Sequence, residues 1–225
     1  MAWYLIWDAG GTLFNTYPAA ASALQQALRE LGYEVSHQEL ISLLRHTTAY
    51  ALQRVAGRFT LDEGELRVRF AEAYASMDPV EQPPFPGAVD VCRWVCDHGG
   101  ANFIVTHRSW SLLEPLLKAH HLEELFVDWI TGDDPYPRKP DPGALLAMAI
   151  RHRLPLARCL VIGDRELDVV AARRAGMAAC LFRGDRSQGE DDAEQMADLT
   201  ISHYHELLTW LEEHTRTESG AFGGA

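Results

Sequence analysis

Residues 3–12 have the sequence WYLIWDAGGT, a short apolar run that ends at Asp8 and is followed by Gly10 and Gly11. An apolar run of this length, closed by glycines, is typical of a buried parallel strand that ends in a tight loop. The run is too short to span a membrane, and no basic residues precede it as they would in a secretory signal. We therefore expect residues 3–7 to form a buried strand.

Similar apolar runs recur along the chain and alternate with segments of helical periodicity. The expected strands are residues 3–7, 101–106, 127–131, 159–163, 178–182 and, more weakly, 198–202. The expected helices between them are residues 87–98, 110–120, 142–152, 167–175 and 204–214. This alternation predicts an α/β fold with a doubly wound parallel (Rossmann-like) sheet and helices on both of its faces.

The segment from about residue 18 to residue 83 interrupts the alternation, because it contains only helical patterns. The expected helices here are residues 19–31, 37–47, 49–55 and 62–76. We predict a small all-helical cap domain, residues 17–83, inserted after the first strand of a core domain that comprises residues 1–16 and 84–214. Residues 14–17 and 79–87 are the expected hinges. The polar, glycine-containing residues 215–225 are expected to form a disordered tail.

The composition is ordinary for a soluble globular protein, with 47% hydrophobic and 23% charged residues among 225. The formal net charge of −12 argues against binding to nucleic acid or to an anionic membrane, since both need a basic surface. The four cysteines have neither CxxC nor zinc-finger spacing, so we expect buried free thiols in a reducing cytoplasm. A cytoplasmic monomer or weak dimer fits these features.

Polar side chains follow the expected strands at their carboxyl ends, which meet at one edge of a parallel sheet. They are Asp8 after the first strand, Thr106 after the second, Lys139 after the third, and Asp164 and Asp168 after the fourth. Three carboxylates, a hydroxyl and a lysine suit an oxygen-ligated Mg²⁺ that faces a phosphoryl group. Metal and lysine would neutralise the phosphate, the hydroxyl would donate to it, and a carboxylate could attack it.

With these residues in place, the chain resembles the haloacid-dehalogenase-like superfamily, in the subgroup that carries a helical cap after the first motif. Four segments match the motifs of that superfamily in order: residues 8–13 (DAGGTL), 104–108 (IVTHR), 138–142 (RKPDP) and 162–168 (IGDRELD). Each motif alone is weak, but four in order at the expected strand ends are a strong signal for the fold. Phosphoglycolate-type phosphatases are a similar capped subgroup, so the resemblance implies a small phosphorylated metabolite as substrate.

The resemblance also implies roles for individual residues. Asp8 would be the nucleophile that forms an aspartyl-phosphate, and Thr106 would donate a hydrogen bond to the phosphoryl oxygens. Lys139 would pair with Asp8 and with the phosphate. The implied Mg²⁺ ligands are Asp8, the backbone carbonyl of Gly10, and Asp164, with Asp168 either ligating the ion or orienting its waters.

One position departs from the pattern of the resembling phosphatases. They carry a second aspartate two residues after the nucleophile, which protonates the leaving group and then activates the hydrolytic water. This chain has Gly10 there, which cannot transfer a proton. A positioned general acid–base contributes roughly 10²–10⁴-fold to the rate.

Other branches that lack this aspartate do not match either. Phosphonate-cleaving members use a cap lysine, and residues 18–83 contain none. The haloacid dehalogenases carry a tyrosine at the position of Gly10, and the sugar-phosphate mutases need the missing aspartate.

Three interpretations stay open. The first is a phosphatase with a substitute proton carrier, for which His107 is the preferred candidate because an imidazole titrates near neutral pH; His46 in the cap, or a phosphate of the substrate itself, could also serve. The second is a slow phosphatase restricted to good leaving groups, because transfer to Asp8 is mostly positioning and electrostatics. The third is a catalytically impaired phosphate-binding or interaction module that retains the fold.

The cap would select the substrate, and its polar candidates are Arg45, His46, Arg54 and Arg58. Trp110, just past the second motif, could line the pocket or belong to the core. The sequence does not identify the substrate beyond a small phosphomonoester.

Overall fold

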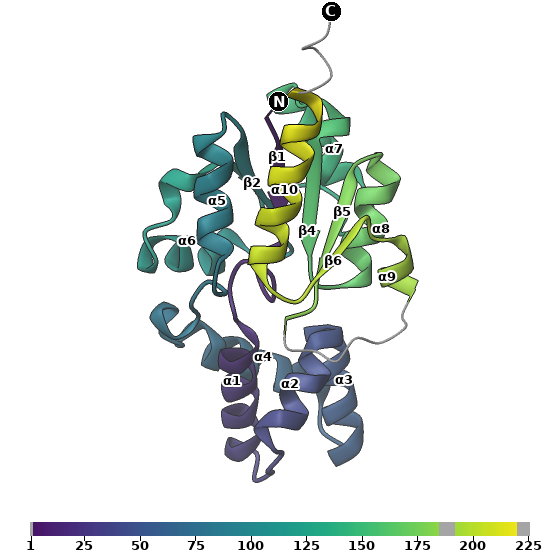
Figure 1. Ribbon diagram of the computed structural model, residues 1–225. Coiled ribbons are helices and arrows are strands. Elements are labelled where there is room, and N and C mark those ends of the chain that lie inside the picture. The colour runs from purple at the N-terminus through teal and green to yellow at the C-terminus, as the bar shows by residue number, and fades with distance from the viewer. Residues whose placement is uncertain (1, 185–191, 220–225) are drawn as a thin grey trace, which may run out of the picture. The chain divides into compact units, whose positions relative to one another are not determined.

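The computed structural model describes residues 2–184 and 192–219 (Figure 1). The chain divides into two compact units, one formed by Met1–Leu13 and Pro84–Ala225, the other by Phe14–Pro83. We call the first the core unit and the second the helical unit. No helix in the described part of the chain is long and apolar enough to cross a membrane.

The core unit contains a parallel sheet of six strands in the order β3-β2-β1-β4-β5-β6. The strands are β1 (Tyr4–Trp7), β2 (Ala101–Val105), β3 (Phe126–Ile130), β4 (Cys159–Gly163), β5 (Ala178–Phe182) and β6 (Leu199–Ile201). Trp7, the last residue of β1, lies opposite Ile104 of β2 and Ile162 of β4. The carboxyl ends of the three central strands therefore lie at one edge, and the sheet confirms the expected α/β class.

Helices cover both faces of the sheet (Figure 1). They are α5 (Ala88–Asp97), α6 (Trp110–Ala119), α7 (Gly143–His152), α8 (Glu166–Ala175), α9 (Asp192–Met196) and α10 (Tyr204–Ser219). Alternate residues of β1 point to opposite faces because the side-chain period of a strand is two. Ile6 joins a buried cluster with Met148 of α7 and Val169 of α8. Trp7 packs on the other face, with its ring 5.5 Å from that of Tyr204 at the start of α10.

The helical unit consists of α1 (Tyr17–Glu30), α2 (His37–His46), α3 (Thr48–Phe59), α4 (Glu63–Ala75) and the short 3₁₀ helix η1 (Pro79–Glu81). Three of its helices begin at a side chain that accepts a hydrogen bond from the first turn: Ser36 for α2, Thr47 for α3 and Asp62 for α4. Such caps satisfy backbone N–H groups that have no partner inside the helix. Leu24, Leu52 and Leu66, all fully buried, contribute to the core of this unit.

Two features differ from the sequence-based expectation. Helix α10 continues to Ser219, so residues 215–219 are helical rather than part of a disordered tail. No glycine or proline follows Tyr204 until Gly220, and the hydroxyl of Thr215 donates to the carbonyl of Leu211 within the helix. The remaining residues of the expected tail, 220–225, lie outside the described residues. Helix α9 was not predicted, because one and a half turns are too short to show a period.

Candidate active site

The carboxyl edge of the sheet holds the first aspartate. Asp8 follows β1, and its backbone N–H donates to the carbonyl of Ile162 in β4 at 2.8 Å. Thr106 follows β2 in the same way, with its N–H on the carbonyl of Ile130 in β3 at 2.9 Å. Both side chains are buried, at 2% and 4% relative exposure. Hydrogen bonds to neighbouring strands thus fix the backbone positions of Asp8 and Thr106.

Lys139 connects the third motif to the other carboxylates. Its ammonium nitrogen lies 2.7 Å from Asp8 Oδ1 and 2.6 Å from Asp168 Oδ1, and it donates to the carbonyl of Val105 at 3.0 Å. Two of these contacts, with Asp8 and the Val105 carbonyl, are hydrogen bonds, and the contact with Asp168 is an ion pair. The loop after β3 and the start of α8 are therefore held to β1 and β2 through one cation.

These contacts set the charges of the site. Burial alone would raise the pKa of Asp8, but the charges of Lys139 and Arg165 outweigh it and hold that pKa below its ordinary value. Burial works to lower the pKa of Lys139, yet the carboxylates of Asp168 and Asp8 raise it above its ordinary value. Burial raises the pKa of Asp168. Asp8 is therefore held in its ionised form, whereas burial opposes the ionised form of Asp168.

Asp164 follows β4 and is fully buried. The hydroxyl of Thr12 donates to Asp164 Oδ1 at 3.4 Å, and the carbonyl of Thr12 accepts a hydrogen bond of 2.8 Å from the Tyr204 hydroxyl. Thr12 belongs to the first motif, but neither partner could be inferred from the sequence, because they lie more than 150 positions away. Tyr204 thus ties the start of α10 to the loop after β1.

Asp168 lies in the first turn of α8, where it is 1% exposed. Its Oδ2 accepts a hydrogen bond from the backbone N–H of Arg165 at 3.2 Å, and its Oδ1 pairs with Lys139. Gly163 makes room for this side chain, since a Cβ at that position would lie 2.2 Å from the Cβ of Asp168. Asp168 is therefore positioned by three different segments of the core unit.

The donor chemistry fits a hard divalent cation with few protein ligands. Among the residues that the structure describes, no group of three or more His, Cys, Asp and Glu side chains forms a metal-binding cluster. Both oxygens of Asp168 have partners, Lys139 and the Arg165 N–H, whereas Asp8 meets Lys139 through Oδ1. Asp8, Asp164 and the Gly10 carbonyl are therefore the favoured candidate ligands. Mg²⁺ usually keeps several waters and binds through one or two carboxylates together with substrate phosphate. The set of oxygens here is of that kind.

His107 makes a contact that the sequence did not reveal. Its Nε2 accepts a hydrogen bond of 2.8 Å from the backbone N–H of Lys139. Burial, aided by the charge of Lys139, lowers the pKa of His107 to about 4. A neutral imidazole with one nitrogen engaged in this way is a poor proton donor at neutral pH, so the geometry weighs against His107 as the substitute proton carrier. It favours a role in holding the segment that carries Lys139.

A cavity of about 80 Å³ lies beside Thr106 and Lys139. Its wall is formed by the ends of β2 and β3 and by the loop that leads to Lys139, including Thr131, Tyr136 and Arg138. Trp110 is not among the residues that line this cavity. Its ring stacks on that of Trp129 in β3 at 4.6 Å, and its backbone N–H donates to Asp133.

The polar candidates of the helical unit make contacts within that unit. Arg58 forms an ion pair of 2.8 Å with Glu39, and its side chain is 55% exposed. The rings of His46 and Tyr50 lie 4.8 Å apart, and the guanidinium of Arg54 lies 6.0 Å from the Tyr50 ring. Arg45 is half-buried.

Comparison with known proteins agrees with the fold. Residues 5–182 match the haloacid dehalogenase-like hydrolase family, and the chain belongs to this family. The phosphoglycolate phosphatase of Pseudomonas fluorescens is 28% identical over 214 residues, which are 91% of this chain and 78% of that protein. Phosphoglycolate phosphatase 1 of Pseudomonas aeruginosa is 29% identical over 219 residues, covering 93% and 79%. The crystal structure of a hydrolase from Pseudomonas syringae is 26% identical and covers 95% of this chain and 99% of that one, with a TM-score of 0.73.

Proposed function

We propose that this hydrolase is a Mg²⁺-dependent phosphatase of a small phosphomonoester that acts through an aspartyl-phosphate on Asp8. The observation that carries the proposal is the buried pair of Asp8 and Lys139, which are 2.7 Å apart, next to Thr106 and Asp164 at one sheet edge. The phosphatase names of the similar Pseudomonas proteins support the choice of a phosphate ester. Phosphoglycolate is the first substrate to test for the same reason.

In this mechanism, an ionised oxygen of Asp8 attacks phosphorus, and the bond from phosphorus to the leaving oxygen breaks. Lys139 holds the attacking carboxylate in place and lowers its pKa. Thr106 would donate a hydrogen bond to a phosphoryl oxygen. Mg²⁺, held by Asp8, Asp164 and the Gly10 carbonyl, would supply positive charge against the phosphoryl oxygens. Water attack on the acyl-phosphate then returns Asp8 and releases inorganic phosphate.

Because Gly10 cannot transfer a proton, the proton transfers are the slow part of this reaction. The leaving oxygen needs a proton in the first step, and the attacking water must lose one in the second. Without a positioned acid–base, both steps slow by roughly 10²–10⁴-fold. We therefore propose a phosphatase of low intrinsic activity, in which the proton comes from the substrate's own phosphate or from the helical unit. His46 is the candidate in that unit.

The helical unit would act as the cap that closes over the substrate and excludes water. Its residues Arg45, Arg54 and Arg58 would then select among phosphate esters. Residues 14–17 and 79–87 would be the hinges, and unchanged turnover after both are stiffened by proline would contradict a moving cap. A cytoplasmic location and a monomer or weak dimer complete the proposal.

A phosphate-binding module without catalysis is the second candidate, and Gly10 is the observation that favours it. Binding needs Thr106, Lys139 and the metal ligands, all of which are present, whereas turnover also needs the proton transfers. The two candidates differ in whether phosphate is released from an ester.

The test is rapid-mixing turnover of an aryl phosphate and of phosphoglycolate with Mg²⁺, comparing the wild type with Asp8→Asn and Gly10→Asp. We expect slow turnover by the wild type and none by Asp8→Asn. A burst of about one equivalent followed by a stall would show that the second step is limiting, and Gly10→Asp should then relieve the stall. Wild-type product formation no greater than that of Asp8→Asn would refute the enzyme and leave the binding module.

A further inference from the structure

The donor capacity of Lys139 limits what it can give to a phosphate. Three oxygens lie within 3.0 Å of its ammonium nitrogen: Asp8 Oδ1 and the Val105 carbonyl accept hydrogen bonds from it, and Asp168 Oδ1 forms an ion pair with it. With three oxygens already packed around the ammonium nitrogen, a phosphoryl oxygen can approach Lys139 only by displacing one of them. The side chain is also just 2% exposed. A phosphoryl group with three charged oxygens would therefore need a further cationic partner at this edge.

Arg165 is the other cation at the site. It directly follows Asp164, and its Nε lies 3.7 Å from Asp164 Oδ1. Its backbone is extended, with φ −131° and ψ 157°, just before α8 begins, and its N–H is held by Asp168 Oδ2. The side chain is 20% exposed, ten times the fraction of Lys139, so a ligand from solvent can reach it. The local backbone thus anchors Arg165, whose side chain as a whole stays partly exposed although its Nε is buried.

The charge of Arg165 acts on the residues that surround the phosphate position. It acts to lower the pKa of Asp8, which follows β1, and of His107, which follows β2, and it opposes the rise that burial causes in the pKa of Asp168 in the first turn of α8. The buried carboxylates of Asp8, Asp164 and Asp168 face two cationic side chains, Lys139 and Arg165. One of these two cations is enclosed by its ion pairs, and the other borders solvent.

We propose that Arg165 is a further phosphate-binding residue, whose guanidinium donates to the oxygens of the phosphoryl group that Asp8 attacks. The planar fork of a guanidinium matches two oxygens of a phosphoryl group, and it stays charged at every relevant pH. Gly10 cannot protonate the leaving oxygen, so negative charge that develops in the transition state stays on the oxygens. A fixed cation such as Arg165 would stabilise that charge. The inference rests on the proposed function, since it assumes that a phosphoryl group binds beside Asp8.

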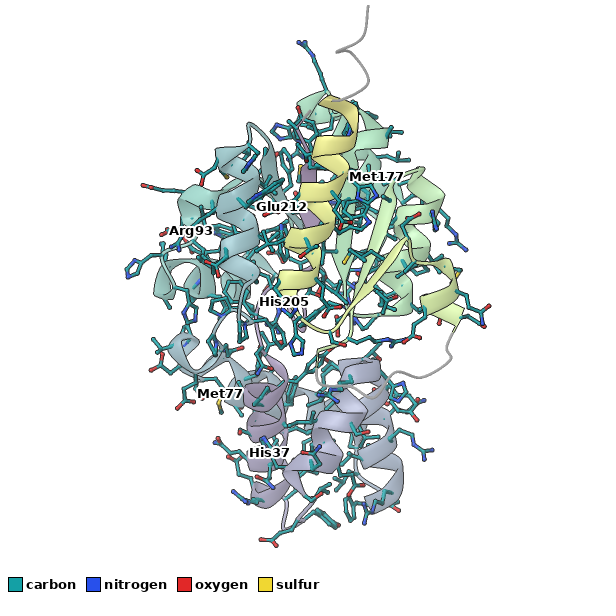
Figure 2. All side chains as sticks on the ribbon, in the orientation of Figure 1. His37, Met77, Arg93, Met177, His205 and Glu212 are labelled. Carbon is teal, nitrogen blue, oxygen red and sulfur yellow. The ribbon has the colours of Figure 1, made fainter. Side chains whose placement is uncertain are left out.

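The experiment measures binding of inorganic phosphate by calorimetry in the presence of Mg²⁺, which needs no turnover. The proteins compared are the wild type, Arg165→Gln, Arg165→Lys and the control Arg93→Gln. Arg93 is exposed on α5 and is labelled in Figure 2. We expect Arg165→Gln to weaken phosphate binding by roughly 10- to 100-fold, as for loss of a hydrogen bond to a charged group. Arg165→Lys should retain part of the affinity, because it keeps the charge and loses the fork, and Arg93→Gln should bind like the wild type.

Two results would overturn the inference. If Arg165→Gln binds phosphate as tightly as the wild type, the guanidinium makes no contact with it. If Arg165→Gln instead tightens Mg²⁺ binding and leaves phosphate unchanged, Arg165 only offsets the charge of Asp164. Should Arg165→Gln fail to fold, Arg165→Lys decides, since affinity equal to the wild type would show that the fork is not used. If the wild-type protein binds no phosphate, the proposed function itself is refuted. That outcome is seen with the wild type alone and is therefore distinct from a failure of the inference about Arg165.

Discussion

Gly163 and Gly57 show how differently two glycines are placed in one chain. Gly163 ends β4, where an added Cβ would lie 2.2 Å from the Cβ and 2.6 Å from Oδ2 of Asp168. Gly57 lies on the exposed side of α3, where an added Cβ would meet no atom within 4 Å. The first glycine provides space for a site residue, and the second provides only backbone freedom.

Gly163→Ala should destabilise the protein by about 1–3 kcal/mol, the usual cost of overpacking. The displaced Asp168 would also loosen its pairing with Lys139. Gly57→Ala is the matched control and should stabilise the protein by about 0.5–1 kcal/mol, because alanine favours a helix interior. Urea denaturation gives both values; equal effects of the two substitutions would contradict the close approach at Gly163.

The sequence indicated the residues of the site better than their partners. Asp8, Thr106, Lys139, Asp164 and Asp168 could be predicted because each follows a short apolar run or lies in a motif. The hydrogen bond from Lys139 N–H to His107 Nε2 could not, because it depends on how two loops meet in space. Arg165 could not be singled out either: its sequence position shows that it follows Asp164, but not that its side chain stays partly exposed beside that carboxylate.

At the scale of elements, β3 and α7 are joined by one carboxylate. Asp128 of β3 accepts hydrogen bonds from Arg151 at 2.8 Å and from His152 at 2.7 Å, both in α7. It also accepts from the N–H of Trp129. Burial opposes the ionised form, but these hydrogen bonds outweigh it and lower the pKa of Asp128. This carboxylate therefore favours the folded state most when it is ionised.

Asp128→Asn should lower the free energy of unfolding at pH 7 by about 1 kcal/mol, since Arg151 is largely exposed and the pair is screened by solvent. The folded-state pKa lies below the unfolded value, so the stabilisation is present above about pH 4 and is lost as the pH falls through the folded-state pKa. Urea denaturation of both proteins at pH 7 and at pH 3 measures this. If the difference in unfolding free energy between the wild type and Asp128→Asn grows as the pH falls, the prediction is wrong.

Helix α10 reaches the site through Tyr204. Replacing it by phenylalanine keeps the ring between Trp7 and Phe182 and removes only the hydroxyl that donates to the Thr12 carbonyl. We expect Tyr204→Phe to cost about 1–3 kcal/mol, because a buried carbonyl loses its partner. Tyr33→Phe, in the helical unit, should change stability by less than about 0.5 kcal/mol. Thermal unfolding of both variants checks this, and equal melting temperatures would refute the role of the hydroxyl.

The elements that could be predicted are those with a strong period. The runs that end at Trp7, Val105 and Gly163 are strands in the structure, with ends that differ by at most one residue from those expected. Strand order could not be read from these runs, because pairing depends on which crossovers pack helices on which face. Helix α9, Asp192–Met196, has too few residues to show a helical face.

At the scale of the whole molecule, the tryptophans are distributed unevenly. All six lie at positions 3, 7, 94, 110, 129 and 210, so each belongs to the core unit and none to Phe14–Pro83. Tryptophan fluorescence therefore reports on the core unit, whereas far-ultraviolet circular dichroism also reports on the helices of the other unit.

We expect the two signals to give separate unfolding transitions in urea, because each unit has its own buried core. Leu52→Ala, in the helical unit, should cost about 2–5 kcal/mol and shift the dichroism transition while leaving the fluorescence transition in place. Leu160→Ala, in β4, should do the reverse; both leucines are fully buried. Coincident transitions in the wild type and in both variants would show that the chain unfolds as one cooperative unit.

The place of β1 in the sheet has a consequence for how the chain emerges from the ribosome. β1 ends at Trp7 but pairs with β2 and β4, and β4 begins only at Cys159. At about 5–20 residues per second, the interval before β1 gains its second neighbour is on the order of ten seconds or more. During that time all residues of the helical unit, Phe14–Pro83, have been synthesised. The apolar strand β1, by contrast, still has one edge without a neighbouring strand. At this stage of synthesis, a chaperone that binds a single extended segment would shield the exposed edge of β1.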